Sequence, residues 1–308
     1  AVTAATANLR LPPRTLATHR HPADDADWAE VEFAAVNLGD QRLHRRLIAL
    51  AHDFWAKPGT LMPEACGGSH AKTKAAYRFM SNPEIDLDTV LAPHVQATAG
   101  RCREHALVLA VQDTTTLNYS TTRLLEGMGP IGATTDKSIG LLLHETIAFT
   151  EEGTPLGLVD AQCWGRDATQ AAKKNLRHAL SVEDNESLKW LKGYQAAAAV
   201  QRSCPATTIV VVSDRESDLY ELFAEAAKTP DGPRVLVRAE RTRYRTVGEG
   251  PLWGHVEALA PAGFVEVHVP RQRNRPARTA RLAVRFTTTE LVPPRGKKRL
   301  GRVAMTAV

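Results

Sequence analysis

Two apolar stretches that each run into an aspartate decide the fold of this chain. The first reads Leu-Ala-Val-Gln-Asp-Thr-Thr-Thr at residues 109–116, and the second reads Val-Val-Val-Ser-Asp-Arg-Glu-Ser-Asp at residues 210–218. Short apolar runs rich in β-branched residues are typical of buried strands. In open α/β sheets, ligands collect outside the carboxyl ends of the strands. Asp113 and Asp214 therefore become neighbours if the two strands are parallel and adjacent.

Two neighbouring carboxylates point to a divalent cation. Unpaired carboxylates a few ångströms apart repel each other, and one takes up a proton unless a cation lies between them. Mg²⁺ prefers hard oxygen ligands and keeps waters that can attack a phosphate, and Mn²⁺ can take its place. Two plainer interpretations stay open, because Asp214 also suits the acid-rich start of a helix and Asp113 also suits an Asx-type turn.

The periodicity around these two stretches predicts a mixed α/β core with a β-rich insertion. A hairpin turning at Glu151-Glu152-Gly153 is predicted between the first and second stretches, and the C-terminal part alternates in short strands. The predicted strands are 106–112, 140–149, 154–163, 208–213, 234–238, 264–269 and 281–286, and the predicted helices are 185–202 and 216–228.

The first hundred residues have helical periodicity instead. Residues 1–26 lack apolar periodicity and are expected to form a flexible leader. Four helices are expected after it, and the last of them runs towards Cys102. The signals are Asp27 with Glu30 for the first helix, the Leu38-Gly39-Asp40 turn before the second, Lys57-Pro58-Gly59 at its end, Ser69 before the third and Asp86 before the fourth.

Composition and charge narrow the class of protein. The chain has 308 residues, 43% hydrophobic and 24% charged, which is ordinary for a globular protein and excludes disordered, collagen-like and disulfide-scaffold chains. The net charge of +5 hides an uneven distribution, because 16 basic and 5 acidic residues follow Pro233, whereas the first 233 residues carry 23 basic and 29 acidic ones. The strongly cationic last quarter suggests a phosphate-rich partner.

The four cysteines give no metal or disulfide pattern. Cys66, Cys102, Cys163 and Cys204 are widely spaced, without a C-x-x-C pair, so zinc and disulfide frameworks are not expected and a reducing cytoplasm fits. The longest apolar runs are far shorter than the roughly 20 residues of a membrane helix, and the N-terminus has no signal-peptide pattern.

Two acidic segments carry a recognisable pattern. They are Gln112-Asp113-Thr114-Thr115-Thr116-Leu117-Asn118-Tyr119 and Asp214-Arg215-Glu216-Ser217-Asp218-Leu219. They closely resemble two motifs of the DDE cut-and-paste transposases, of the bacterial transposon-five type in the insertion-sequence-four group. Further similar stretches occur in the same order over nearly the whole chain. They are Trp28 to Arg46, Ala75-Ala76-Tyr77-Arg78-Phe79 with Asn82-Pro83, Asp136-Lys137-Ser138, Lys189-Trp190-Leu191, and Arg273-Asn274-Arg275-Pro276-Ala277-Arg278.

The resemblance implies an α/β fold with a ribonuclease H-like mixed sheet and a β-rich insertion, preceded by a small all-helical DNA-binding domain. In these terms residues 27–103 are the helical domain, residues 104–238 an incomplete catalytic core and residues 239–308 a truncated Arg-rich insertion. Asp113 and Asp214 match the two Asp positions that bind Mg²⁺ or Mn²⁺ and carry catalysis. The implied DNA contacts are Arg42, Arg46, Lys72, Arg78, Arg238, Arg275 and Arg278, although a solvated helix face also explains the first four.

The family has a third carboxylate, a Glu in a Tyr, Arg, Glu, Lys signature beyond the β insertion. The sequence ends at Val308 before such a segment, and the late acids Glu240 and Glu290 do not sit in that pattern. The resemblance therefore predicts a truncated transposase of bacterial cytoplasm, inactive by itself in metal-dependent strand cleavage and transfer at transposon ends. Its expected partners are double-stranded DNA and, in the synaptic complex of the intact family, a second copy.

Two other functions were weighed beside this one. The first is a non-catalytic DNA-binding protein or an inhibitor derived from a transposase, because the basic surface remains without the third acid. The second is a carboxylate-pair hydrolase acting on sugars, which leaves the cationic last quarter unexplained.

Overall fold

A six-stranded mixed sheet forms the middle of the molecule, which is described here from a computed structural model covering residues 27–120, 126–132, 138–166, 186–248, 250–273 and 275–308. The strand order is β2-β3-β1-β5-β6, and β4 pairs with β3. β1 is antiparallel to β3 and parallel to β5, and β5 is parallel to β6. The strands are β1 (Leu107–Asn118), β2 (Gly129–Pro130), β3 (Ile139–Phe149), β4 (Pro155–Trp164), β5 (Thr208–Ser213) and β6 (Arg234–Val237).

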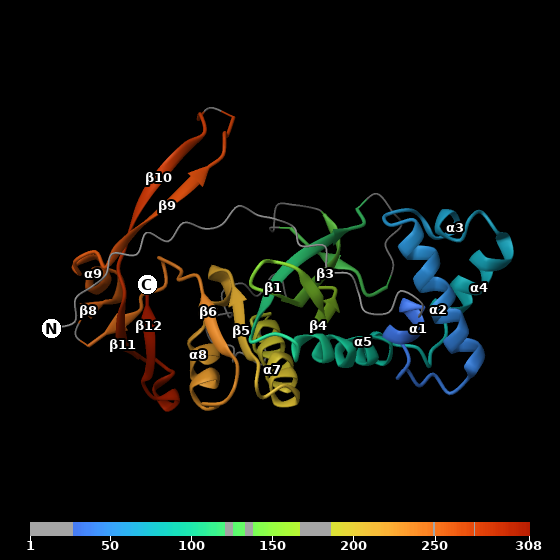
Figure 1. Cartoon of the computed structure of the whole chain (residues 1–308), viewed down its shortest axis with the longest axis horizontal. Coiled ribbons are helices and arrows are strands. Elements are labelled where there is room, and N and C mark those ends of the chain that lie inside the picture. Colours follow the sequence, from blue (N-terminus) through green and yellow to red (C-terminus); the bar gives the residue numbers. More distant parts are fainter. Residues whose placement is uncertain (1–26, 121–125, 133–137, 167–185, 249, 274) are drawn as a thin grey trace.

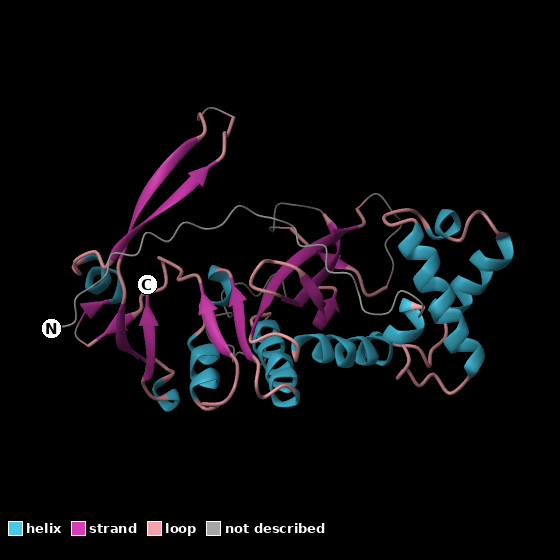
Figure 2. Ribbon diagram, in the orientation of Figure 1, coloured by secondary structure: helices cyan, strands magenta, loops and turns pink. Residues whose placement is uncertain are grey.

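Helices cover one face of this sheet. Figure 2 shows α5 (Leu87–Cys102), α7 (Leu188–Ser203) and α8 (Tyr220–Ala227) along the same side of the strands. The strand residues that point to these helices are buried, whereas their alternate neighbours on the other face are half-buried. The main apolar core therefore lies between the sheet and the helices, with Val108, Ala110, Ile209 and Val211 against Trp190, Tyr194, Ala197 and Leu222.

The N-terminal helices form a second cluster at one end of the molecule (Figure 1). They are α1 (Trp28–Glu32), α2 (Gln41–Ala56), α3 (Met62–Ala65) and α4 (His70–Met80). The predicted caps of four helices are confirmed, because the side chains of Asp27, Asp40, Ser69 and Asp86 accept backbone N–H groups of α1, α2, α4 and α5. Gly39, with φ 70°, makes the turn before α2.

Helix α5 joins the two clusters. Val90 near its start packs with the helical cluster, whereas Ala99 and Cys102 near its end belong to the main core. The helical region predicted over residues 27–103 is thus continuous with the sheet through its last helix.

The C-terminal part adds a small sheet and a projecting ribbon. Strands β7 (Thr246–Val247), β8 (Gly250–Pro251), β11 (Thr287–Val292) and β12 (Val303–Ala307) form a sheet in the order β12-β11-β7-β8, which packs on α8 and α9 (Leu252–Glu257). Strands β9 (Gly263–Val269) and β10 (Arg278–Val284) form a separate antiparallel ribbon that extends away from the rest of the molecule (Figure 1). The mixed α/β class and the β-rich C-terminal region agree with the sequence prediction.

Three boundaries differ from the predictions. β1 continues through Asp113 to Asn118, because residues 113–118 pair with Glu145 to Gly140 of β3. The helix predicted over residues 216–228 is observed as α8, but it begins later, at Tyr220. The 3₁₀ turn η3 (Arg215–Ser217) precedes it and is separated from α8 by Asp218 and Leu219. The strand predicted at 281–286 is the end of β10, which stops at Val284, and residues 285–286 link it to β11.

Several predictions fall outside the described residues. They are the leader at 1–26, Asp136 and Lys137 of one resembling stretch, and Asn185 at the start of the helix observed as α7. Among the residues described, we find no helix whose length and apolar character would suit a crossing of the lipid bilayer.

Candidate functional site

The two aspartates singled out from the sequence lie on neighbouring parallel strands at the same level. The pairing of β1 with β5 ends at Val111 opposite Val212, and Asp113 and Asp214 each follow two residues later. Since side chains alternate along a strand, the two carboxylates follow the same face of the sheet as Val111 and Val212. The structure therefore brings Asp113 and Asp214 to one edge, as the sequence predicts.

The Asp113 carboxylate has one oxygen engaged by the backbone. Its Oδ1 accepts the N–H of Thr114 at 2.7 Å, and the side chain is exposed. Because β1 continues past this residue, Asp113 is held by strand pairing with Glu145 of β3. The Asx-turn interpretation of Asp113 is therefore wrong.

Asp214 is held by the short turn that follows β5. Its Oδ1 accepts the N–H of Glu216 at 2.8 Å, which caps η3. The backbone carbonyl of Asp214 accepts the Ser217 hydroxyl at 2.7 Å, and Ser217 is fully buried. The capping interpretation is thus right for a 3₁₀ turn rather than for a long helix, and it uses only one carboxylate oxygen.

A buried polar network supports Asp113 from the covered face of the sheet. His144 Nδ1 lies 2.8 Å from the Thr114 hydroxyl, and His144 Nε2 lies 3.2 Å from Gln112 Oε1. Burial lowers the pKa of His144 to about 4, with a further contribution from Lys189. The imidazole is therefore neutral at pH 7 and links the residues on both sides of Asp113.

Glu145 is a neighbour of Asp113 that the sequence analysis missed. The two residues are direct cross-strand partners, which places their Cβ atoms on the same face at about 4.5–5.5 Å. The signal was not readable from the sequence, because residues 119–138 between the strands leave the register of β1 and β3 undetermined.

The two carboxylates at this edge are hard oxygen donors, the ligand type that Mg²⁺ and Mn²⁺ take. Asp113 and Asp214 each have one oxygen not used by a backbone N–H, and neither forms an ion pair in the part of the chain that is described. Mg²⁺ is commonly bound by one or two carboxylates with water and substrate phosphates completing its shell. Within the same described ranges no group of three His, Cys, Asp or Glu side chains is close enough to hold a metal ion.

The four predicted DNA contacts of the helical region fall into two kinds. Arg42 is paired with Asp40 at 3.2 Å, and Lys72 is paired with Asp53 at 2.8 Å. Arg46 is half-buried and Arg78 is exposed, and the described residues offer neither of them an ion-pair partner. Arg46 and Arg78 are therefore the more available cations.

The remaining predicted contacts lie elsewhere. Arg238 is exposed directly after β6, and its N–H donates to Ser213 O at 3.1 Å, next to Asp214. Arg275 and Arg278 are exposed at the far end of the β9–β10 ribbon. Helices α2 and α4 and the β9–β10 ribbon lie at opposite ends of the molecule, with β1 and β5 between them (Figure 1), and Arg238 lies beside Asp214.

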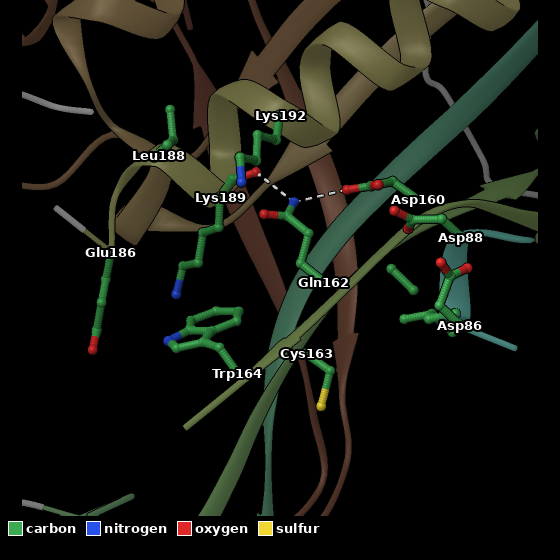
Figure 3. Close-up of a pocket in the computed structure, with 12 residues that line it drawn as sticks. Asp86, Asp88, Asp160, Gln162, Cys163, Trp164, Glu186, Leu188, Lys189 and Lys192 are labelled. Carbon is green, nitrogen blue, oxygen red and sulfur yellow. Dashed lines mark hydrogen bonds between the residues drawn. The ribbon is translucent and has the colours of Figure 1, made fainter. Parts of the chain in front are cut away.

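A pocket of about 600 Å³ lies apart from Asp113 and Asp214, which do not line it. Figure 3 shows three acids, Asp86, Asp88 and Asp160, at one end, and the Lys189 side chain beside Trp164 at the other. Gln162 connects the two ends, since its Nε2 donates to Asp160 at 2.7 Å and to the Lys189 carbonyl at 3.1 Å. Burial raises the pKa of Asp160, with the Asp88 charge adding to the shift. The pocket joins α5, β4 and α7 at the junction of the two apolar clusters.

Comparison with known protein families gives a match in the helical region. Residues 25–85 match a family model described as transposase DNA-binding. The match covers α1 to α4 and includes Arg42, Arg46, Lys72 and Arg78. It indicates a transposase-related DNA-binding role for this region, with DNA as the partner.

Proposed function

We propose that this chain carries the DNA-binding region and the metal-binding aspartates of a DDE cut-and-paste DNA transposase of the bacterial transposon-five type. The observation that carries the proposal is the parallel register of β1 and β5, which sets Asp113 and Asp214 at one sheet edge. The transposase DNA-binding match at residues 25–85 supports it independently, because it concerns a different part of the chain.

The sheet topology supports the ribonuclease H-like assignment that the resemblance implies. Three antiparallel strands, β4, β3 and β1, are followed by the parallel strands β5 and β6, with α7 and α8 in the connections. Ligand sites in such sheets lie at the carboxyl ends of parallel strands. Asp214 lies at such an end, and Asp113 lies beside it.

In this mechanism the chain's own residues bind DNA and hold the reacting phosphodiester. The helical region reads the transposon end, and Arg46 and Arg78 are the two predicted contacts there without an ion pair among the described residues. Arg238 holds the DNA strand beside Asp214, while Arg275 and Arg278 contact the backbone farther away. Asp113 and Asp214 would hold Mg²⁺ or Mn²⁺, which supplies an activated water and stabilises charge on the phosphate.

Metal binding tests the assignment directly. Mn²⁺ titration, followed by the electron paramagnetic resonance signal of the free ion, should reveal a site in the wild-type chain that Asp113→Ala and Asp214→Ala both remove. Asp231→Ala is the matched control, because Asp231 is exposed in the loop before β6. Undiminished Mn²⁺ binding by Asp113→Ala or by Asp214→Ala would refute the assignment of these two residues as metal ligands.

A non-catalytic DNA-binding protein or transposase inhibitor is the second candidate. It is favoured by the lack of a three-ligand group among the described residues. Both candidates require an affinity for duplex DNA that falls steeply with salt, because phosphate contacts release counterions. A Mn²⁺ site that both Asp113→Ala and Asp214→Ala remove favours the transposase over a non-catalytic DNA-binding protein, and a salt-independent response would contradict both. Light scattering on the DNA complex tests the homodimer expected from the family.

A further inference from the structure

Asp218, four residues after Asp214, is the most buried carboxylate near the aspartate edge. Its side chain is 2% exposed, and that of its partner Arg245 is 9% exposed. Both Nε and Nη2 of Arg245 donate to Asp218 Oδ1, at 2.9 and 2.6 Å, and the N–H of Glu240 donates to Oδ2 at 2.9 Å. Every carboxylate oxygen is thus satisfied by one segment of the chain.

That segment, residues 238–245, is called the arginine strap here. It leaves β6 and leads into β7, and four of its eight residues are arginines. Two guanidinium groups of the strap also hold backbone carbonyls of the Asp214 turn, defined as residues 213–218. Arg245 Nη2 donates to Asp218 O at 2.5 Å, while Arg243 donates to Asp218 O and, at 3.3 Å, to Glu216 O.

The strap and the turn meet at both ends. Arg238 N–H donates to Ser213 O at 3.1 Å, at the start of the turn, and Asp218 binds Arg245 at its end. Within the turn, the hydroxyls of Ser213 and Ser217 are 2.5 Å apart. Asp214 therefore sits on a short backbone segment whose two ends are both held by the strap.

We propose that Asp218 is a positioning residue, which fixes the Asp214 carboxylate for metal binding by locking the Asp214 turn to the arginine strap. This inference rests on the proposed metal site at Asp113 and Asp214. Asp218 does not reach that site, because its carboxylate is used by Arg245 and Glu240. It acts through the backbone that carries Asp214.

The physical reason is the geometry that a metal ligand needs. Residues that orient a ligand commonly change metal affinity by about 10- to 100-fold when they are replaced. The other side-chain hydrogen bonds described for the Asp214 turn lie within the turn, and η3 is only three residues long and is separated from α8. Loss of the Asp218 carboxylate leaves Arg245 buried without its counter-charge and frees the carbonyls that the strap holds.

The test is Mn²⁺ affinity in Asp218→Asn, measured at a temperature where circular dichroism shows the variant folded. We expect affinity to fall by about 10- to 100-fold. Glu32→Gln is the matched control, because it also replaces a carboxylate held by an arginine, Arg101, but far from the turn. Its Mn²⁺ affinity should equal that of wild type. Arg245→Lys keeps a positive charge opposite Asp218 and should lose less affinity than Asp218→Asn.

The outcomes separate this inference from the proposed function. If Asp214→Ala abolishes Mn²⁺ binding while Asp218→Asn binds as wild type, the positioning role is overturned and the metal site stands. If Asp214→Ala also binds as wild type, the metal site itself fails. Should Asp218→Asn not fold, Arg243→Gln decides, because it removes only the bonds to Glu216 and Asp218 carbonyls. A loss of affinity supports the inference, and unchanged affinity overturns it.

Discussion

Two carboxylates, the half-buried Glu32 and the buried Asp218, join the central sheet to its neighbours on opposite sides. Glu32 of α1 accepts two bonds from Arg101 at 2.8 and 2.9 Å, and Arg101 Nε donates to Leu156 O of β4 at 2.5 Å. Asp218 joins the end of the Asp214 turn to the strap that leads to the C-terminal sheet. Each junction pairs two nitrogens of an arginine with one carboxylate, although Arg101 binds both Glu32 oxygens and Arg245 binds only Oδ1 of Asp218.

The junctions differ in what they hold in place. At the first, His94 Nε2 accepts the Leu158 N–H and His94 Nδ1 lies 2.5 Å from Glu32, so the neutral ring with its proton on Nδ1 suits both contacts. That junction fixes a helix against β4, the strand beyond β3 from Asp113. The second fixes the turn that carries Asp214. Similar ion pairs can therefore hold a helix against a strand in one place and hold the turn of a candidate metal ligand in another.

The largest effect is expected at the second junction. Arg245→Ala leaves the Asp218 carboxylate buried without its cation, which should lower the free energy of unfolding by about 3–5 kcal/mol. Urea denaturation measures this change. Arg241→Ala is the control, because Arg241 pairs with Glu257 at 3.6 Å on the surface and should cost less than about 1 kcal/mol. Equal losses in the two variants would contradict the buried role of Arg245.

The first junction should be weaker and sensitive to acid. Burial alone raises the pKa of Glu32, but hydrogen bonds from His94 and Arg101 outweigh it and lower the pKa to about 2. A depressed carboxyl pKa stabilises the fold above its unfolded value near 4.5, and this contribution is lost as the pH falls towards 2.

Glu32→Gln should accordingly lose about 2 kcal/mol at pH 7 and very little at pH 2. Unfolding midpoints measured between pH 7 and the lowest pH at which wild type folds give the difference. A loss that does not shrink on acidification would show that the Glu32 charge is not the source of the stability.

Two helical glycines, Gly193 of α7 and Gly100 of α5, differ in how much space an added side chain would have. Gly193 of α7 lies under the Asp113 end of β1, where a Cβ would come within 2.7 Å of Gln112 Oε1 and Thr146 Oγ1. Gly100 of α5 precedes Arg101 of the first junction, and a Cβ added there would meet no atom within 4 Å. Gly193→Ala should therefore destabilise by about 1–3 kcal/mol, whereas Gly100→Ala should stabilise by up to about 1 kcal/mol.

Thermal unfolding of the two variants side by side checks this expectation. A stabilising Gly193→Ala would mean that Gln112 and Thr146 can move aside, and the network of Gln112, His144 and Thr114 would then not be the rigid support of Asp113 described above.

Local signals in the sequence were enough to predict where most helices of the N-terminal region begin. The caps Asp27, Asp40, Ser69 and Asp86 act within three residues of themselves, so their roles could be read without knowing the fold. The short helix α3 was not foreseen, because no side chain caps its start at Leu61.

Long-range contacts explain the failures. The helix predicted from residue 216 is interrupted where Asp218 binds Arg245, a partner 27 residues away that no local pattern identifies. Glu145 faces Asp113 only because β1 and β3 pair in a register that the intervening residues do not fix. The pair Asp113 and Asp214 was foreseen because each follows an apolar strand, and their approach needed only parallel pairing.

We expect the smallest effects on stability from replacing the exposed cations of the helical region. The quantity to measure for these variants is their DNA affinity. Lys72 must leave Asp53, 2.8 Å away, before it can contact a phosphate, whereas Arg78 is exposed without an ion pair among the described residues. Arg78→Ala should weaken duplex DNA binding several-fold and reduce the slope of log affinity against log salt by about 1. Lys72→Ala should change the affinity and the slope less than Arg78→Ala does. Each variant should alter the unfolding free energy by less than about 1 kcal/mol.

Fluorescence anisotropy over a salt series measures the slopes. A larger loss for Lys72 than for Arg78 would mean that DNA breaks the Lys72–Asp53 pair and that the helical region rearranges its surface charges on binding.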